Sequence, residues 1–397
     1  MDGIRIHRES LQSLLPDMAG WRRHLHRNPE LSYHETKTAQ YIAQLLNSFG
    51  CEVRTGIGGH GVTAVIRGKL PGPVVALRAD IDALPIQDEK ETEYASSVPG
   101  VMHACGHDAH TAAMLGIAKY YMENLQYVKG TRKLIFQPAE EVTPGGALPM
   151  IAEGVLDDVD AIFGVHLWTP LPYGVIASKA GPFMAAADEF TIEITGRGGH
   201  GGLPHETADA VVAGSALVQS LQTIVSRNVN PLQPAVVTVG SFHAGSTANV
   251  IAEKARLTGT VRTFDPEIKK QIKQRISDII SATCALYGAS GWFDYRDGYP
   301  CVVNHESETE RFFRVGAQLL GPEAVKESEY IMAGEDFSYY LQHKPGCFMF
   351  VGAGNQEIGA HYSHHHPKFD LDERSMLVSG ALLMSMADDY AEAASDE

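Results

Sequence analysis

Ten residues, MHACGHDAHT at 102–111, contain three histidines, a cysteine and an aspartate. Imidazole and thiolate groups bind transition metals, and a thiol beside an imidazole can also act as a nucleophile. Cys105 and His107 are two residues apart, so in an extended segment both side chains point the same way, and His103 shares that alternation as a supporting candidate. The segment predicts a metal site or a Cys–His nucleophile, unless Asp108 merely caps a helix rich in histidine.

Further side chains able to bind a metal follow the predicted strands. Apolar runs at 74–80 (VVALRAD), 133–137 (KLIFQ) and 161–168 (AIFGVHLW) predict three buried strands. The acidic and imidazole groups at or just beyond their carboxyl ends are Asp80, Asp82, Glu140, Glu141 and His166. Ligands bind beyond the carboxyl ends of strands in an open parallel sheet, so we expect these groups to converge with MHACGHD. Each has an ordinary structural explanation alone, but their conjunction favours a site.

The elements that must position these groups alternate between strands and helices. Two amphipathic helices are predicted within 11–50, and strands and helices then alternate as far as the strand at 161–168. This alternation favours the α/β class with a mostly parallel sheet. After a shift in composition at 170–188, half-polar strands indicate a smaller α+β domain. The predicted boundaries place one domain at 1–184 and 298–397, with the second inserted at 185–297.

Composition excludes several classes of partner. The 397 residues are enough for two domains, and 48 acidic against 32 basic residues give a formal charge of −16. Nucleic acid and anionic membranes both require a basic surface, so neither is expected as a partner. The first residues lack the apolar run of a signal peptide, and no stretch approaches the roughly 18 apolar residues of a membrane span. Five scattered cysteines without a CxxC pair favour the reducing cytoplasm.

A glycine-rich segment offers a different interpretation. GRGGHGG at 196–202 satisfies the GxGxxG pattern of dinucleotide-binding proteins. That fingerprint also needs an acidic residue about 20 positions later at the end of the next strand, and this chain has SALVQSLQTI there. A nicotinamide oxidoreductase is therefore disfavoured. A Cys–His nucleophile stays open in principle, although it would leave the carboxylates and His166 without a role.

Four motifs together resemble a known family. MHACGHDAHT, QPAEE, GVHLW and HHPKF are similar to the aminoacylase, hippurate hydrolase and auxin-conjugate hydrolase branch of the dinuclear metallo-aminopeptidase and carboxypeptidase superfamily. The resemblance extends over essentially the whole chain, including the GRGGHGG and NVIAE segments of the inserted domain. It implies a metallo-aminopeptidase-like catalytic domain with a smaller lid and dimerisation domain.

The resemblance also implies a set of metal ligands. By position in the motifs these are Cys105, His107, Glu141, His166 and His365. Cys105 would bridge two cations, and His365 is chosen because it stands two residues before the proline of PKF. His364 and His366 remain alternatives in that histidine cluster. Relatives outside this branch have His-x-Asp where this chain has Asp80-Ile81-Asp82, so Asp80 is not expected to bind metal, while Asp82 orients a ligand.

The chemistry implied by the resemblance is hydrolysis of an amide. Two cations roughly 3.5–4 Å apart can acidify a water and polarise a carbonyl, with Glu140 as the general base. His200, reaching from a partner subunit, would stabilise the tetrahedral oxyanion. Asn249 and Arg262 are candidates for holding a substrate carboxylate, and a plain surface cation is the alternative for Arg262.

We therefore expect a cytoplasmic, homodimeric amidohydrolase that acts on N-acyl-L-amino acids carrying acetyl, benzoyl or similar groups. Thiolate and imidazole ligands favour Zn²⁺, while carboxylate and water also admit Mn²⁺, Co²⁺ or Ni²⁺. A dipeptidase or carboxypeptidase using the same site is the second enzymatic interpretation. A metal-binding protein without catalytic activity is the third, and the presence of Glu140 argues against it because a storage site needs no unligated base.

Overall fold

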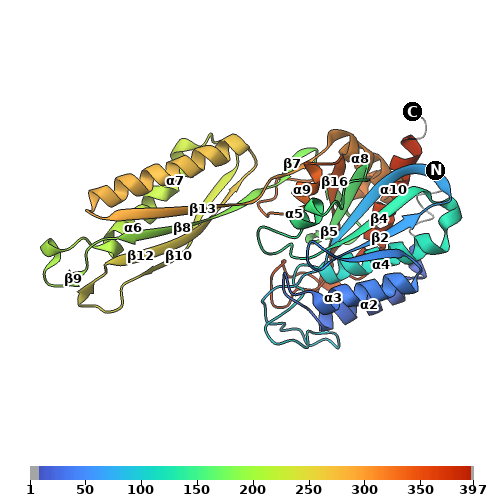
Figure 1. The fold of residues 1–397 in the computed structure, drawn as a ribbon, viewed down its shortest axis with the longest axis horizontal. Coiled ribbons are helices and arrows are strands. Elements are labelled where there is room, and N and C mark those ends of the chain that lie inside the picture. The colour runs from blue at the N-terminus through green and yellow to red at the C-terminus, as the bar shows by residue number, and fades with distance from the viewer. Residues whose placement is uncertain (1–8, 395–397) are drawn as a thin grey trace. The chain divides into compact units, whose positions relative to one another are not determined.

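The computed structural model describes residues 9–394, which divide into two compact units (Figure 1). The first unit comprises the chain up to Phe183, Val302–Glu329 and the chain from Asp336 onward. The second comprises Met184–Cys301 and the short segment Tyr330–Glu335, which the sequence did not suggest. No helix among the described residues is long and apolar enough to cross a membrane.

The first unit is built on an eight-stranded mixed sheet with the order β1-β2-β4-β3-β5-β16-β6-β15. Its strands are β1 (Glu52–Ile57), β2 (Gly61–Arg67), β3 (Leu70–Asp80), β4 (Lys129–Gln137), β5 (Ala161–Pro172), β6 (Ile176–Ser178), β15 (Val325–Glu327) and β16 (Gly346–Gly354). The central strands β4, β3, β5 and β16 pair in parallel, so their carboxyl ends share one edge. The predicted α/β class with a mostly parallel sheet is confirmed.

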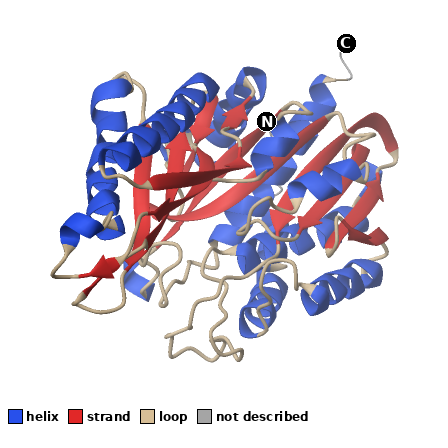
Figure 2. Ribbon diagram, turned by 60° about the vertical axis from the view of Figure 1, so that its left-hand side comes forward, coloured by secondary structure: helices blue, strands red, loops and turns tan. Residues whose placement is uncertain are grey.

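Helices cover both faces of this sheet (Figure 2). They are α2 (Leu15–Arg27), α3 (Thr36–Ser48), α4 (His107–Glu123), α5 (Ala147–Ala152), α8 (Glu306–Leu320), α9 (Phe337–Leu341) and α10 (Ser375–Ala393). Phe163 and Met349 belong to the core shared with α4 and α10. Their neighbours Gly164 and Phe348 face the other side, where Phe337 of α9 packs 4.9 Å from the Phe348 ring centroid. A short pair, β7 (Gly181–Met184) and β14 (Val302–Asn304), completes the unit.

The second unit is an antiparallel sheet packed against two helices. The strands are β8 (Ala186–Thr195), β10 (Ala235–Ala244), β12 (Lys254–Thr263) and β13 (Ser290–Tyr299), in the order β10-β12-β8-β13. Helices α6 (Ala210–Thr223) and α7 (Pro266–Leu286) contribute to its core. In α7 the buried Ile268, Ile272, Ile276 and Ile280 recur every fourth residue, so one helical face meets the sheet.

The GRGGHGG segment follows β8, which pairs with both of its neighbours in antiparallel fashion. A dinucleotide-binding glycine loop instead joins a strand of a parallel sheet to a helix whose N-terminus meets the pyrophosphate. Here the segment continues into β9 (Gly199–His200), which pairs with β11 (Val250–Ile251). The structural context therefore argues against dinucleotide binding.

Candidate metal centre

Side chains from separate segments meet at the carboxyl edge of the central strands. Asp80 is the last residue of β3, Glu140 and Glu141 follow β4, and His166 lies within β5. The Sγ atom of Cys105 lies 3.4 Å from Nε2 of His166. The predicted convergence beyond the strand ends is therefore present in the first unit.

Two groups of atoms able to bind a metal share Cys105. One donor atom each from Cys105, His107 and Glu141 lie within 4.8 Å of one another, and the same holds for Cys105, His166 and His364. A single sulfur thus belongs to both groups, which is the arrangement a bridging ligand requires. The structure brings Cys105, His107, Glu141 and His166 together as the sequence analysis expected.

The segment before α4 is not extended as predicted. Gly106 has a φ of +94° and α4 begins at His107, so a left-handed turn separates Cys105 from His107. This conformation is strained for any residue with a Cβ, which explains the glycine. His103 does not join the donor groups, and neither of its buried ring nitrogens makes a hydrogen bond.

Asp108 is not the helix cap that the alternative interpretation required. Gly106 occupies the cap position, and the Asp108 side chain is directed to another helix. Its Oδ2 accepts from Nε of Arg22 at 3.1 Å and lies 2.8 Å from Nδ1 of His26. The carboxylate therefore ties the start of α4 to α2, an interaction spanning 86 positions that a local pattern does not reveal.

Asp82 holds both His107 and Glu141. Nδ1 of His107 lies 2.9 Å from the backbone oxygen of Asp82 and 3.2 Å from its Oδ1. Oδ2 accepts from the backbone N–H of Glu141 at 3.0 Å and from Oγ of Ser32 at 2.7 Å. Because a carbonyl oxygen can only accept, the proton of His107 is assigned to Nδ1, and Nε2 faces the donor group.

His110 is a site residue that the sequence analysis missed. Its Nδ1 lies 2.7 Å from Oδ1 of Asp80, and its Nε2 accepts from the backbone N–H of Leu167 at 2.8 Å. Leu167 follows His166, so His110 links the end of β3 to the part of β5 that carries a predicted ligand. The available signal was its spacing of three from His107, which places both on one face of a helix.

His166 has the form suited to a metal ligand. Its Nδ1 lies 2.9 Å from the backbone oxygen of Leu167, which assigns the ring proton to that nitrogen and leaves the Nε2 lone pair toward Cys105. Burial, reinforced by His110 and His364, lowers the pKa of His166 well below its usual range. A neutral imidazole is the state that binds metal.

The three histidines at 364–366 have different surroundings. His364 stacks on Trp168 with ring centroids 4.5 Å apart and provides the third member of the group containing Cys105 and His166. Its Nδ1 is buried without a hydrogen bond. His364 is therefore an alternative to His365 as the metal ligand from this cluster.

His365 lies beside the other donor group. Its Nε2 is 3.2 Å from Oε1 of Glu141, and 51% of its side chain is exposed. His366 instead stacks on Tyr362, and its Nδ1 accepts the backbone N–H of Lys368. The backbone thus directs His364 and His365 toward different donor groups and leaves His366 bonded within its own loop.

The carboxylates around His107 create an environment that favours a cation. Burial alone would lower the pKa of this imidazole, but Asp80, Asp82 and Glu141 outweigh it and raise the pKa to about 10. Nε2 of His107 lies 3.7 Å from Oδ2 of Asp80 and 3.9 Å from Oε1 of Glu141. A divalent cation would supply the positive charge that these groups otherwise obtain from a proton.

The surroundings of Cys105 disfavour a nucleophilic thiolate. Burial, together with the charges of Glu141, Glu140 and Asp80, raises the pKa of its thiol well above the usual value. Reactive cysteines need a lowered pKa, so the Cys–His nucleophile is disfavoured. A metal would deprotonate the same sulfur on binding.

Two buried atoms test whether these residues fit a metal. Nε2 of His107 makes no hydrogen bond, and neither does Oε1 of Glu141, although Nε2 of His365 lies 3.2 Å away. Unsatisfied buried polar atoms are costly and uncommon. Imidazole, carboxylate and thiol groups that face one another in this way fit divalent cations well.

The remaining predicted residues lie in the second unit. His200 pairs with Val250 across β9 and β11, and the backbone oxygen of Asn249 accepts from Gly201 at 2.8 Å, so His200 and Asn249 are neighbours. Arg262 stands eight residues beyond Lys254 on β12, about 26 Å along the strand. Asn249 and Arg262 of the same chain are therefore too far apart to bind one substrate carboxylate together.

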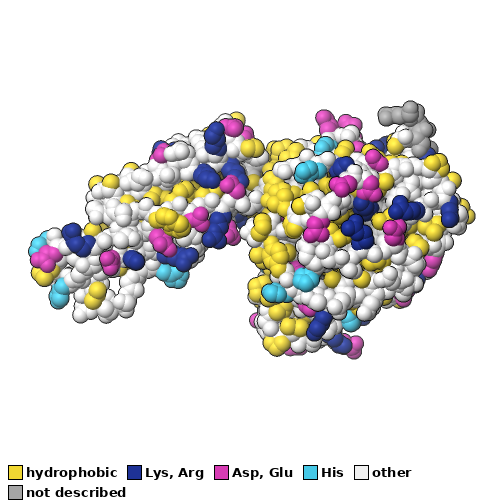
Figure 3. Space-filling model, in the orientation of Figure 1, with side chains coloured by type: hydrophobic (Ala, Val, Ile, Leu, Met, Phe, Trp, Pro, Cys, Tyr) yellow, Lys and Arg dark blue, Asp and Glu magenta, His cyan; other side chains and the backbone are white. Residues whose placement is uncertain are grey.

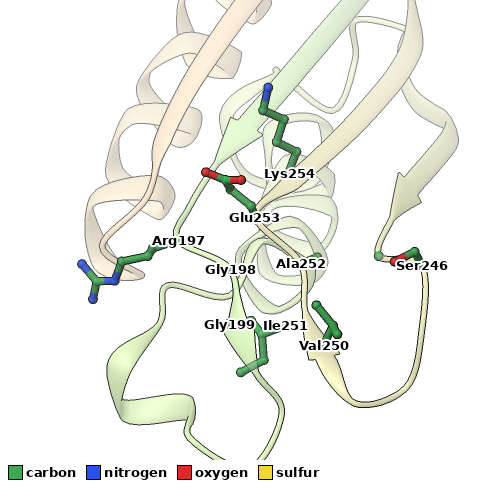
Figure 4. A pocket seen from close by; sticks show the side chains of 10 residues that line it. Arg197, Gly198, Gly199, Ser246, Val250, Ile251, Ala252, Glu253 and Lys254 are labelled. Carbon is green, nitrogen blue, oxygen red and sulfur yellow. The ribbon is translucent and has the colours of Figure 1, made fainter.

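A cavity of about 470 Å³ is lined by Gly199, the residue that precedes His200 in the chain (Figure 4). Gly198 and Gly199 line one side, and Val250, Ile251 and Lys254 line another. A Cβ on Gly198 would lie only 2.9 Å from the backbone oxygen of Ile251. The glycines of GRGGHGG therefore permit close approach of two backbone segments, which is a structural role for them.

An α/β sheet that gathers thiol, imidazole and carboxylate donors at its carboxyl edge defines a metal-dependent hydrolase. The sequence profile of Peptidase family M20/M25/M40 matches residues 76–389, and the chain belongs to this family. The resemblance to the aminoacylase branch noted from four motifs is thereby confirmed.

Relatives extend over nearly the whole chain. The protein YhaA of Bacillus subtilis, named as an amidohydrolase, is 50% identical over 382 residues, 96% of each chain. Thermostable carboxypeptidase 2 of Saccharolobus solfataricus is 40% identical and covers 94% of this chain and 96% of its own. N-acetyl-L-cysteine deacetylase of Bacillus subtilis is 42% identical, covering 95% of this chain and 89% of its own.

Solved structures agree with this assignment. A protein of methicillin-resistant Staphylococcus aureus, named as an aminohydrolase, has a TM-score of 0.89 and 39% identity, covering 98% of this chain and all of its own. The YXEP protein of Bacillus subtilis, described as a dinuclear metal-binding peptidase of family M20, has a TM-score of 0.81 and 35% identity, covering 96% and 99%. The protein is thus a metallohydrolase that acts on amides and uses divalent metal ions.

Proposed function

We propose that the protein is an N-acyl-L-amino acid amidohydrolase that releases acetyl, benzoyl or similar acyl groups from an amino acid nitrogen. The observation that carries this proposal is a buried carboxylate, Glu140, which directly precedes Glu141 in the chain and whose charge acts on Cys105. Deacetylases and amidohydrolases among the relatives support the same activity. On the face shown in Figure 3, acidic and basic side chains are interspersed, without the basic patch that a nucleic acid would need.

The proposed ligands of two cations are Cys105, His107, Glu141, His166 and His365, with His364 as the competitor to His365. Cys105 would serve both positions because its sulfur belongs to both donor groups. We favour Zn²⁺ or Mn²⁺, with Co²⁺ or Ni²⁺ as further choices. When bound, the cations supply Lewis acidity toward the substrate carbonyl and lower the pKa of water.

Glu140 is proposed as the general base. It would accept a proton from the attacking water and return it to the leaving nitrogen, a role worth about 10²–10⁴ in rate. Asp82 keeps His107 in place and fixes the backbone of Glu141, so it is a positioning residue. The lid and dimer role of the second unit follows from the resemblance and stays a proposal, as does the cytoplasmic location.

The acyl preference is tested with two substrate panels assayed on the same metal-loaded enzyme. We expect N-acetyl and N-benzoyl amino acids to be hydrolysed with kcat/KM at least about tenfold above unmodified dipeptides. A relative named as a carboxypeptidase makes the reverse order the alternative. Preference for peptides with a free amino terminus would replace the proposed activity with a dipeptidase.

His200 is proposed to donate to the tetrahedral oxyanion from the partner subunit of a homodimer. We expect His200→Ala to lower kcat by about 10²–10³ while retaining the metals, because one oxyanion donor is lost. His205→Ala is the matched control, since His205 is exposed on the same loop. Asn249, which neighbours His200, and Arg262 remain the proposed residues for binding the substrate carboxylate.

Mixed dimers of His200→Ala and Glu140→Gln chains decide between the two arrangements. If His200 serves the partner, one site of each mixed dimer combines an intact Glu140 with an intact His200, and activity returns. If His200 serves its own chain, both sites carry a defect. Absence of recovery in verified mixed dimers would therefore reject the arrangement across subunits.

A further inference from the structure

Glu35 is a buried carboxylate that no step so far has used. It occupies the cap position of α3, where acidic residues commonly bind the first N–H groups of a helix, yet it makes no capping hydrogen bond. The residue has no exposed surface, and Oε2 has no hydrogen-bond partner. Burying a carboxylate in this way is unfavourable, so helix capping does not account for its presence.

The other oxygen of Glu35 accepts hydrogen bonds from two residues that have a left-handed backbone conformation. Oε1 accepts the backbone N–H of Tyr33 at 3.0 Å and that of Ala139 at 2.8 Å. Their φ angles are +67° and +54°, and within residues 9–394 the only other non-glycine residue of this kind is His365. Such conformations persist only where the surrounding structure enforces them, and they concentrate at functional sites.

One of these strained residues leads directly into the metal centre. Ala139 precedes Glu140, so its backbone angles set the direction in which the Glu140 side chain leaves the chain, whereas the backbone of Glu141 is fixed separately by Asp82. Tyr33 binds the part of the loop that follows Glu140. Its hydroxyl donates to the backbone oxygen of Val142 at 2.9 Å and accepts from the N–H of Gly145 at 3.2 Å. Residues 33–35 therefore form hydrogen bonds with the loop on both sides of Glu140.

We propose that Glu35 is a positioning residue for Glu140, acting through the hydrogen bond that keeps Ala139 in its left-handed conformation. This inference rests on the proposed function, because it acts through the general base assigned there. Both backbone N–H groups bind the same oxygen, Oε1, so the role requires an acceptor oxygen at that place. Burial raises the pKa of Glu35 to about 7, which disfavours the charged form of the side chain. An uncharged side chain with a similarly placed oxygen can therefore replace it.

Two substitutions separate the acceptor from the bulk of the side chain. Glu35→Gln keeps a carbonyl oxygen, whereas Glu35→Met has similar length and no acceptor for Ala139. In the full-length, metal-loaded enzyme we expect Glu35→Met to lower kcat by about 10–100-fold, with KM and metal content nearly unchanged. Glu35→Gln should retain kcat to within about threefold.

The double variant with Glu140→Gln tests whether Glu35 acts through the base. Because that variant has already lost the group being positioned, adding Glu35→Met should not lower its residual rate further. A merely structural role would lower the rate again in the double variant. Full kcat in Glu35→Met, or equal damage by Glu35→Gln, would also overturn the inference.

Tyr33→Phe provides a variant whose folding is not in question, since Tyr33 is 41% exposed. It removes only the hydroxyl that contacts Val142 and Gly145, and we expect kcat to fall by about three- to tenfold. Unchanged kcat in this variant would show that the hydrogen bonds from Tyr33 to the loop after Glu140 are not needed for catalysis, which would count against the inference. Wild-type activity in Glu140→Gln would refute the proposed base itself, whereas loss there without loss in Glu35→Met would refute only the role of Glu35.

Discussion

Glu140→Gln is expected to lower kcat by about 10²–10⁴ while both metals stay bound. The amide has nearly the same shape as the carboxylate but cannot accept a proton from water at neutral pH. Because Glu140 is not among the proposed ligands, elemental analysis should show the same metal content as the wild type. KM should change little, since the substitution removes a group needed in the transition state rather than in binding.

The matched control for this substitution is Glu153→Gln, which makes the same chemical change at an exposed residue just after α5. It should leave kcat, KM and metal content unchanged. If Glu140→Gln retained nearly full activity, another group would have to accept the proton. Loss of metal from that variant would instead show that Glu140 is a ligand.

Cys105→Ala is expected to reduce bound metal and to lower kcat/KM at least about 10³-fold, since metal catalysis supplies several kcal/mol and each 1.36 kcal/mol is a factor of ten. The substitution removes the one sulfur that both donor groups share. Metal content by elemental analysis and hydrolysis of an N-acyl amino acid are measured on the same sample. Removal of metal from the wild type with a chelator should reproduce the loss, and added Zn²⁺ or Mn²⁺ should reverse it.

Cys347→Ala is the control, because Cys347 is equally buried but contacts Ser178 and Thr309 instead of the donor groups. It should retain full metal content. Asp82→Asn should fall between the two, with metal affinity weakened about 10–100-fold, because it disturbs the partner of His107 and leaves the ligands in place. Two tightly bound metals per chain in Cys105→Ala would contradict a bridging sulfur.

Much of the architecture could be read from local patterns. A buried parallel strand needs apolar side chains on both faces, so runs such as AIFGVHLW predict their own strands. The parallel order of such strands places their carboxyl ends together, which made convergence of Cys105, Glu141 and His166 predictable. The family resemblance rested on the same residues.

Other features depend on contacts between positions far apart in the chain. The bond from Ala139 to Glu35 spans 104 positions, and no hydrophobic periodicity encodes it. The same applies to Asp108, whose partners lie on α2, and to the different environments of His364 and His365. Local spacing even misled at 102–108, because the left-handed turn at Gly106 breaks the expected alternation.

The amino-acid sequence alone thus determined which side chains could bind metal and which strand ends would present them, because strand and helix periodicity is a local property. Only the tertiary structure decided which oxygen or nitrogen of each group faces its neighbour. Orientation depends on hydrogen bonds from remote segments, such as those of Asp82 and Glu35, which form only once the sheet is assembled.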